Sequence, residues 1–308
     1  MPVPEAFADD LPVVQAMSRT AEQRSWLAEL PGLVADLEQR WAVTSSAPYR
    51  SGSSSWAAPA SRVDGTAAVL KVAWPHREAT GESAGLRLWA GDGAPLLYEA
   101  DPRRYALLME RCEPGLAVSG LPPEPALAAA GDVLVRLWLA PADKCHLELL
   151  ADVCDEWAAL VQQRFAQLRP PFDPGLVRAG ARLLHTLPAT ASRSVVLHGD
   201  ANPGNILSSA RLPWLAIDPK PMIGDPGYDP APLLVQLADP FAGPDPVAVL
   251  LNRAALMAEV VTEPADRLLA WAFARTVESA LWHTAEGEPQ AAGGAMAEAA
   301  VLALAAGV

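Results

Sequence analysis

The chain has 308 residues, of which 51% are hydrophobic and 19% charged, so it can bury a sizeable core and carries too few charges for a disordered chain. Its formal net charge is −13, from 23 basic and 36 acidic residues. Because contact with nucleic-acid phosphates needs clustered Lys and Arg, this balance argues against nucleic acid. It favours a cationic partner, or it serves solubility alone.

The termini and the cysteines predict a cytoplasmic protein. The N-terminal sequence MPVPEAFADDLPVV lacks the basic start and the long apolar stretch of a signal peptide, and no run of about 18 apolar residues predicts a membrane span. Cys112, Cys145 and Cys154 have spacings that fit neither a zinc site nor a redox pair. We interpret them as ordinary buried thiols in a reducing compartment.

The first clear element is a helix over residues 20–41, where apolar side chains recur at helical spacing. Thr20 and Gln23 have the spacing of a capping box at its start. Pro31 interrupts the pattern, which predicts either a kink or two shorter helices.

An antiparallel sheet follows. The dipeptide Asp64-Gly65 is a strong hairpin signal, and residues 66–73 form the second strand of that hairpin. The other elements expected in this part are a helix over 78–90 and strands over 96–99 and 105–109.

Helical periodicity dominates after residue 110. The expected helices span 123–141, 146–168, 174–187, 229–239, 246–262, 265–285 and 291–306, and one β-rich passage interrupts them at 195–200 and 214–220. The sequence therefore predicts an α+β protein of two lobes. A small antiparallel-sheet lobe occupies 1–110, and a larger, mainly helical lobe occupies 111–308.

The most informative segment is HGDANPGNIL, residues 198–207, followed thirteen residues after Asn205 by Asp218. An apolar strand leads into this polar loop, and a hairpin returns toward it. This arrangement can bring the side chains of Asp200, Asn205 and Asp218 together at one site. A motif is stronger evidence when its predicted structural context fits.

These residue types suit phosphoryl transfer, which requires a positioned hydroxyl and a metal held against the phosphates of ATP. Asp200 can accept the hydroxyl proton, and the oxygens of Asn205 and Asp218 suit Mg²⁺. We expect His198 to tie the loop together by hydrogen bonds. Without this context, His-Gly-Asp is an ordinary turn and Asp218 an ordinary loop acid.

This segment resembles the catalytic loop and metal-binding segment of the aminoglycoside phosphotransferases, distant relatives of protein kinases. The run LAIDPKPMIGDPGYD is similar to the streptomycin 6-phosphotransferase and hydroxyurea phosphotransferase family. The resemblance implies a two-lobed protein-kinase-like fold with ATP between the lobes. It also implies Asp200 as catalytic base, Asn205 and Asp218 as Mg²⁺ ligands and Asp225 as a loop-bracing carboxylate.

The resemblance extends to the nucleotide-binding part. AAVLKVA resembles the strand whose lysine contacts the ATP phosphates, here Lys71, and the following helix supplies Glu82 as its partner. Glu78 competes for that position. A surface lysine on an edge strand and a solvated helix face are the alternative interpretations.

Two further segments resemble nucleotide contacts. YALLMERCEPG resembles the hinge between the lobes, where the backbone from Glu110 to Cys112 would read the adenine edge. The small-residue loop 51–55, with Ser53 at its centre, either covers the phosphates or is a flexible connection.

Several residues are candidates for supporting the site or binding the acceptor. Lys220 either steadies a phosphate oxygen or pairs with Asp225. The candidate substrate residues are Asp229, Glu278, Trp282 and Glu286, with His283 beside them, because carboxylates and an aromatic face suit a guanidinium-bearing sugar. For the residues from Glu278 to Glu286, the alternative is an amphipathic helix with Trp282 in the core.

The chain departs from the family pattern at Ala201 and Asn202, where many relatives have a bulky residue and a His.

The sequence thus predicts an ATP- and Mg²⁺-dependent kinase that phosphorylates a hydroxyl of an aminoglycoside, with streptomycin the leading acceptor. Three alternatives stay open: a kinase of another small molecule such as hydroxyurea, a non-catalytic nucleotide-binding protein of kinase fold, and a helical interaction protein with a chance motif.

Overall fold

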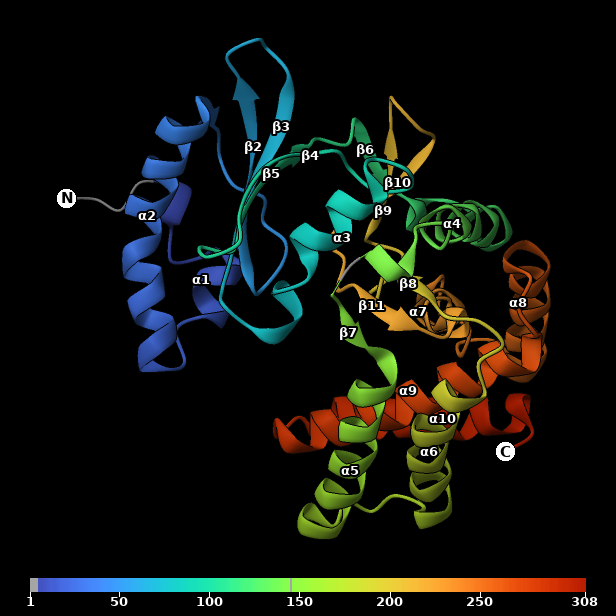
Figure 1. Ribbon diagram of the computed structural model, residues 1–308. Helices are drawn as coiled ribbons and strands as arrows, with labels where there is room; N and C mark the ends of the chain where they lie inside the picture. Colours follow the sequence, from blue (N-terminus) through green and yellow to red (C-terminus); the bar gives the residue numbers. More distant parts are fainter. Residues whose placement is uncertain (1–4, 145) are drawn as a thin grey trace. The chain divides into compact units, whose positions relative to one another are not determined.

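The computed structural model describes residues 5–144 and 146–308, and the chain divides into two compact units, Met1–Gly115 and Leu116–Val308 (Figure 1). The predicted boundary, between residues 110 and 111, falls inside the first of these units.

The first unit contains a five-stranded antiparallel sheet in the order β1-β2-β3-β5-β4. The hairpin of β2 and β3 turns at Asp64-Gly65, as predicted, and Gly65 has a φ of +83°, a left-handed conformation that glycine adopts without strain. The strands are β1 Val43–Ser45, β2 Ser55–Arg62, β3 Ala67–Ala73, β4 Leu97–Asp101 and β5 Ala106–Glu110.

One long helix, α2 (Ala21–Trp41), packs against this sheet, after the short helix α1 (Pro12–Ala16). Its predicted capping box is confirmed, because the Thr20 side chain accepts from the N–H of Gln23 while the Gln23 side chain accepts from the N–H of Thr20. The helix runs on through Pro31, so a division into two helices is wrong. Its apolar face is buried against the sheet, and this packing offsets the backbone hydrogen bond that proline removes.

The helix predicted over 78–90 is shorter than expected. Residues Arg77–Ala79 form a 3-10 turn, and helix α3 covers Glu82–Trp89. Thr80 and Gly81 lie between the two, and Gly81 is the N-cap residue of α3, a position that glycine tolerates.

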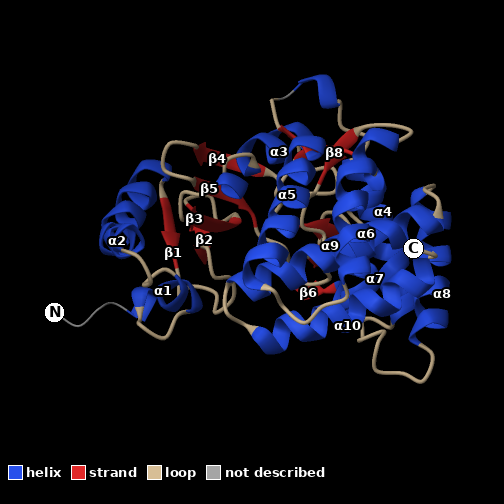
Figure 2. Cartoon of the chain, turned by 90° about the horizontal axis from the view of Figure 1, so that it is seen from below, coloured by secondary structure: helices blue, strands red, loops and turns tan. Residues whose placement is uncertain are grey.

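The second unit is mainly helical (Figure 2). Its long central helix α9 packs against most of the other helices of the unit and buries Trp271 and Phe273. The helices are α4 Pro123–Leu137, α5 Leu150–Leu168, α6 Pro174–Thr186, α7 Ala231–Gln236, α8 Pro246–Val261, α9 Ala265–Ala285 and α10 Pro289–Ala306.

Two small sheets carry the polar loops of interest. In one, β9 (Ile206–Ser209) and β10 (Trp214–Ala216) form the predicted antiparallel hairpin, with β6 (Pro114–Ala117) beside β9. In the other, β11 (Met222–Gly224) pairs with β8 (Val195–Leu197) and with β7 (Glu148–Leu149). β1, β6, β7 and β11 have at most four residues each, too few for a periodic signal in the sequence.

The structure tests the expected burial of the cysteines and the expected absence of a membrane span for the described residues. Cys154 is buried in α5, whereas Cys112 is half-buried, so the interpretation as buried thiols is wrong for Cys112; Cys145 lies outside the described residues. None of the helices described is long and apolar enough to cross a membrane.

Candidate functional site

The predicted catalytic loop is tied to the segment that carries Asp218. The N–H of Lys220 donates to the carbonyl of His198 at 2.8 Å, and the N–H of Ile217 donates to the carbonyl of Asn205 at the same distance. The first bond continues the pairing of β8 with β11 beyond the strand ends. The two segments therefore form one unit, which fixes the loop backbone around Asp200.

His198 is the internal brace of this loop. Its ring is fully buried; Nδ1 accepts from the N–H of Asp200 at 3.3 Å, and Nε2 donates to the carbonyl of Ile217 at 3.1 Å. Burial lowers the pKa of His198, while the carboxylates of Asp229, Asp200 and Asp218 oppose that shift. A neutral ring with its proton on Nε2 satisfies both bonds, which is the tying role expected from the sequence.

Gly199 allows the close approach of the two segments. Its φ is +83°, and a Cβ at this position would lie 1.9 Å from the carbonyl oxygen of Lys220. A side chain here would therefore push the two segments apart, so only glycine fits between His198 and Asp200.

Asp200 is held by donors on both carboxylate oxygens. Nδ2 of Asn202 donates to Oδ1 at 3.2 Å, and Nζ of Lys220 lies 3.4 Å from Oδ2. A quarter of the side chain is exposed, 25%. The expected pairing of Lys220 with Asp225 is therefore wrong: the lysine pairs with Asp200.

Asn205 and Asp218 present oxygens suited to a hard cation. Nδ2 of Asn205 donates to the carbonyl of Asp200 at 2.9 Å, and its Oδ1 accepts no hydrogen bond from the described part of the chain. Asp218 is exposed and has a φ of 56°, a left-handed conformation that Asp tolerates better than most residues. Such conformations cluster at active sites.

The oxygens of these two residues fit Mg²⁺, which binds few protein ligands and completes its shell with water and substrate phosphates. Within residues 5–144 and 146–308, no group of three or more His, Cys, Asp and Glu side chains gathers as a metal site.

Asp229 is hydrogen-bonded to the backbone of the catalytic loop. The prediction that it binds the substrate is wrong. It is 0% exposed, and its carboxylate accepts from the N–H groups of His198 at 2.9 Å and Gly199 at 2.8 Å and from Nε1 of Trp138 at 3.0 Å. These donors satisfy a buried carboxylate and leave it no access to an acceptor molecule.

Asp225 is a brace of a different part of the fold. It is buried and accepts from the N–H of Gly227 at 3.0 Å, from Nε of Arg267 at 2.9 Å and from Nε1 of Trp271. The carboxylate therefore joins the turn that precedes Asp229 to helix α9.

The first unit contains the predicted Lys71–Glu82 ion pair. Nζ of Lys71, on β3, lies 2.6 Å from Oε1 and 2.8 Å from Oε2 of Glu82, in the first turn of α3. Both residues are buried, at 7% and 4% exposure. Glu78 lies in the exposed 3-10 turn before α3, so Glu82 is the partner.

The sequence is similar to known proteins along most of its length. A family profile described as "Aminoglycoside/hydroxyurea antibiotic resistance kinase" matches residues 40–287. The chain is 35% identical over 268 residues to a streptomycin 6-kinase of Streptomyces glaucescens, covering 86% of this chain and 87% of that protein.

The chain belongs to this family. It is a small-molecule kinase, a phosphotransferase that acts on hydroxyl groups, as predicted from the catalytic loop. A hydroxyurea phosphotransferase of Kitasatospora aureofaciens is 34% identical over 282 residues, with 91% of this chain and 80% of that protein covered.

The kinase-like fold is also confirmed. An aminoglycoside phosphotransferase crystallised with AMP-PNP and hygromycin B superposes with a TM-score of 0.63 at 17% identity, over 91% of this chain and all of that one, 100%. The predicted α+β fold, with a small antiparallel-sheet lobe and a larger helical lobe, therefore holds.

The predicted hinge of this kinase has an occupied backbone donor. The N–H of Glu110 donates to the carbonyl of Leu96, and its side chain accepts from the N–H of Leu96 at 3.0 Å. The carbonyl of Cys112 lies close to Gly115, where a Cβ would meet it at 2.8 Å. Glu110 therefore closes the end of β5, and its N–H is not available to a nucleotide in this arrangement.

The small-residue loop of the kinase lies between β1 and β2. Ser53 is exposed, Gly52 has a φ of +81°, and Ser55 already begins β2. The carbonyl of Ser54 accepts from the N–H of Trp74, which anchors the C-terminal end of the loop.

The candidate acceptor residues of the kinase lie on and just beyond α9, and they differ in availability. Glu278 is mostly buried and pairs with Arg164 at 3.2 Å; burial raises its pKa and Arg164 opposes the shift. Trp282 is 42% exposed, so the interpretation that placed it in the core is wrong. His283 contacts the Trp282 ring edge-on and pairs with Glu288, and Glu286 is exposed at the end of the helix.

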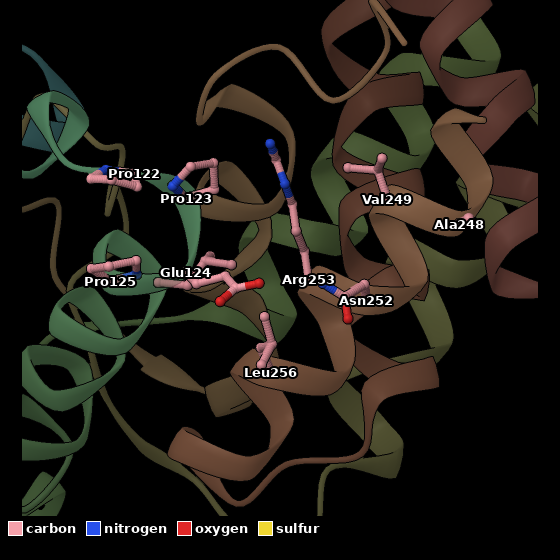
Figure 3. Close-up of a pocket in the computed structure, with 10 residues that line it drawn as sticks. Pro122, Pro123, Glu124, Pro125, Ala248, Val249, Asn252, Arg253 and Leu256 are labelled. Carbon is pink, nitrogen blue, oxygen red and sulfur yellow. The ribbon is translucent and has the colours of Figure 1, made fainter. Parts of the chain in front are cut away.

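A pocket of about 500 Å³ lies elsewhere in the helical unit, between the start of α4 and helix α8 (Figure 3). Prolines of α4 and aliphatic residues of α8 line it, together with Arg253. The Arg253 guanidinium donates to the carbonyls of Leu234 and Ala238, so it stabilises the end of α7. None of the predicted site residues lines this pocket.

Asn202 is a site residue that the sequence did not reveal. Its amide donates to Asp200 and its Oδ1 accepts from the N–H of Gly204 at 2.9 Å, so it both orients the carboxylate and shapes the loop. The available signal was the sequence Asn202-Pro203-Gly204, because an Asn side chain often accepts from the N–H two residues later in a turn.

Proposed function

We propose that this kinase transfers the γ-phosphoryl group of ATP to a hydroxyl of an aminoglycoside, with streptomycin the leading acceptor. The observation that carries the proposal is the partly exposed carboxylate of Asp200, oriented by Asn202 and Lys220 on a loop that Asp229 and His198 brace. Kinase chemistry is largely positioning and electrostatic stabilisation, and this loop supplies positioning.

Asp200 is the catalytic base. Its carboxylate accepts the proton of the acceptor hydroxyl as the hydroxyl oxygen bonds to the γ-phosphorus and the bond from that phosphorus to the bridging oxygen of ADP breaks. Oδ1 of Asn205 and the carboxylate of Asp218 would hold Mg²⁺. The ion neutralises charge on the phosphates when it is bound.

The proposal assigns nucleotide contacts to residues 1–110 and the base, the metal ligands and the acceptor to residues 111–308. In the first part, Lys71 would contact the ATP phosphates, and Glu82 holds its ammonium in place. Ser53, in the same part, would cover the phosphates, and the backbone at Cys112, two residues past this part, would read the adenine edge.

The acceptor class rests on charge and on similarity. A protein of net charge −13 favours a cationic acceptor, and exposed Trp282 and Glu286 offer an aromatic face and a carboxylate to a guanidinium group. Glu278 is a weaker candidate, because a substrate cation would have to displace Arg164 from it.

Hydroxyurea is the second candidate acceptor, because one relative at 34% identity is a hydroxyurea phosphotransferase. It is small and neutral, so it would need neither Trp282 nor Glu286. Substitution of those two residues would therefore affect the two acceptors differently.

The test is ADP release with Mg²⁺ and ATP, measured on the full chain with streptomycin, other aminoglycosides, hydroxyurea and simple amino sugars. Asp200→Asn serves as the blank, because it keeps the shape of the side chain and removes the base. We expect streptomycin to stimulate release, Asp200→Asn to lower kcat at least 100-fold in line with the usual contribution of a general base, and chelation of the metal to stop turnover.

Stimulation by hydroxyurea alone would keep the mechanism and replace the acceptor. Normal turnover in Asp200→Asn would overturn the role of the base. No stimulation by any compound, with ATP binding retained, would favour a nucleotide-binding protein without this activity.

A further inference from the structure

We infer that Lys220 is a positioning residue for the catalytic carboxylate: its ammonium holds Oδ2 of Asp200, so that the carboxylate faces the acceptor in one orientation. The inference rests on the proposed role of Asp200 as base. It departs from both sequence-based roles of Lys220, a phosphate contact and a partner of Asp225.

The backbone of Lys220 is fixed independently of its side chain. Its N–H donates to the carbonyl of His198 at 2.8 Å, and its carbonyl lies against Gly199, where a Cβ would meet it at 1.9 Å. The two residues that precede Asp200 are thus packed against the backbone of Lys220. The backbone of Lys220 is therefore fixed, and the position of its ammonium depends on the contact with Asp200.

The side chain of Lys220 completes a clamp on the carboxylate. Nζ lies 3.4 Å from Oδ2 of Asp200, and Nδ2 of Asn202 lies 3.2 Å from Oδ1. Nδ2 of Asn205 is 3.5 Å from Oδ2, at the limit of a hydrogen bond. Donors on both oxygens restrict rotation about the bond between Cβ and Cγ.

The clamp leaves room for the acceptor. An ionised carboxylate has about four acceptor positions, so the three donors leave a position on Oδ1 for a hydroxyl. The Asp200 side chain is 25% exposed and that of Lys220 36% exposed, so both are reachable from solvent. Because the base of a kinase mainly orients the attacking hydroxyl, fixed direction matters more here than high basicity.

The experiment compares wild type, Lys220→Met, Lys220→Arg, Asp200→Asn and the double variant Asp200→Asn/Lys220→Met as full chains. Methionine is one atom shorter than lysine, keeps an unbranched side chain and the backbone bond of Lys220, and removes the charge. With the acceptor found in the panel above, we expect Lys220→Met to lower kcat by about tenfold or more, because small misplacements of a catalytic group are costly. The KM values for ATP and acceptor should change less than about twofold, because neither contacts Lys220 in the proposed arrangement.

Two further comparisons separate positioning from a structural role. Lys220→Arg keeps the cation and should recover most of the lost kcat. In the Asp200→Asn background, Lys220→Met should cause no additional loss, since the group that it positions is already gone. Unchanged kcat in Lys220→Met, a change in KM for ATP alone, or multiplied losses in the double variant would overturn the inference.

A measurement without substrate keeps the test independent of the proposed function. Thermal unfolding of the same four variants reports the Lys220–Asp200 contact directly. We expect the Tm shifts of the two single variants to be non-additive in the double variant, and additive shifts would overturn the contact. Absence of any acceptor-stimulated ADP release in wild type would count against the proposed function, while the Tm cycle would still decide the contact.

Discussion

Four carboxylates near the catalytic loop have four different environments. Asp229 is buried beneath three donors, Asp225 is buried against Arg267 and Trp271, Asp200 is clamped at the surface and Asp218 is exposed. Burial with satisfied hydrogen bonds suits a brace, and partial exposure suits a group that meets substrate. Burial therefore distinguishes the carboxylates that brace the fold, Asp225 and Asp229, from those available to substrate or metal, Asp200 and Asp218.

The buried His198 makes stability depend on pH in a defined direction. Burial lowers its pKa below the ordinary 6.5, so the folded chain takes up this proton at a lower pH than the unfolded chain does. The stability that a neutral His198 contributes is therefore fully present above pH 6.5 and is lost as the pH falls through its folded-state pKa.

We predict that the urea concentration at the unfolding midpoint falls more steeply with decreasing pH below 6.5 in wild type than in His198→Gln. Glutamine keeps a donor toward Ile217 but cannot titrate. The two proteins share every other titratable group, so the difference in slope reports His198. Parallel midpoint curves would contradict a neutral, buried ring.

At the scale of elements, glycines set the spacing of the helices around α9. Gly180 of α6 faces Val277 of α9, and a Cβ there would lie 2.6 Å from Cγ1 of that valine. Val277 is fully buried, so it has little room to move. Gly293 of α10 is the opposite case, with no atom within 4 Å of an added Cβ.

These two positions make a matched pair of substitutions. Gly293→Ala should raise the free energy of unfolding by about 0.5–1 kcal/mol, because alanine is the better helix former. Gly180→Ala should lower it by about 1–3 kcal/mol, since overpacking outweighs the same gain. Chemical denaturation measures both, and equal effects of the two substitutions would mean that α6 and α9 do not pack through this glycine.

At the scale of the whole molecule, the net charge of −13 has a kinetic consequence for a cationic acceptor. A field of this sign raises the local concentration of cations, and salt screens it with a Debye length of about 10 Å at 0.1 M. The charge acts through many acids at once and needs no single binding residue.

We therefore predict that kcat/KM for streptomycin falls as NaCl rises from about 0.05 to 0.3 M, as screening shortens the range of the field. The value for neutral hydroxyurea, measured if it is accepted, should stay constant over the same range. Equal salt dependence of the two would show that the net charge plays no part in acceptor capture.

Local patterns made much of the fold predictable. The hairpin at Asp64-Gly65 and the helix Ala265–Ala285 are set by turn chemistry and by periodicity within a short stretch of chain. The same holds for the capping box at Thr20. Local patterns left alternatives where long-range packing decides, as at Pro31, where packing on the sheet accompanies one continuous helix and only the division into two helices is wrong.

The sequence by itself determined the order of the elements and the kinase motif, because the spacing of Asp200, Asn205 and Asp218 depends on one loop and one hairpin. Only the tertiary structure decided what each neighbouring polar residue does. The bond from Trp138 to Asp229 and the bond from Arg267 to Asp225 join residues far apart in the chain, and the Lys220–Asp200 contact depends on how β11 lies against β8. Burial and pairing arise from chain segments that meet only on folding, and the identity of a residue carries no record of them.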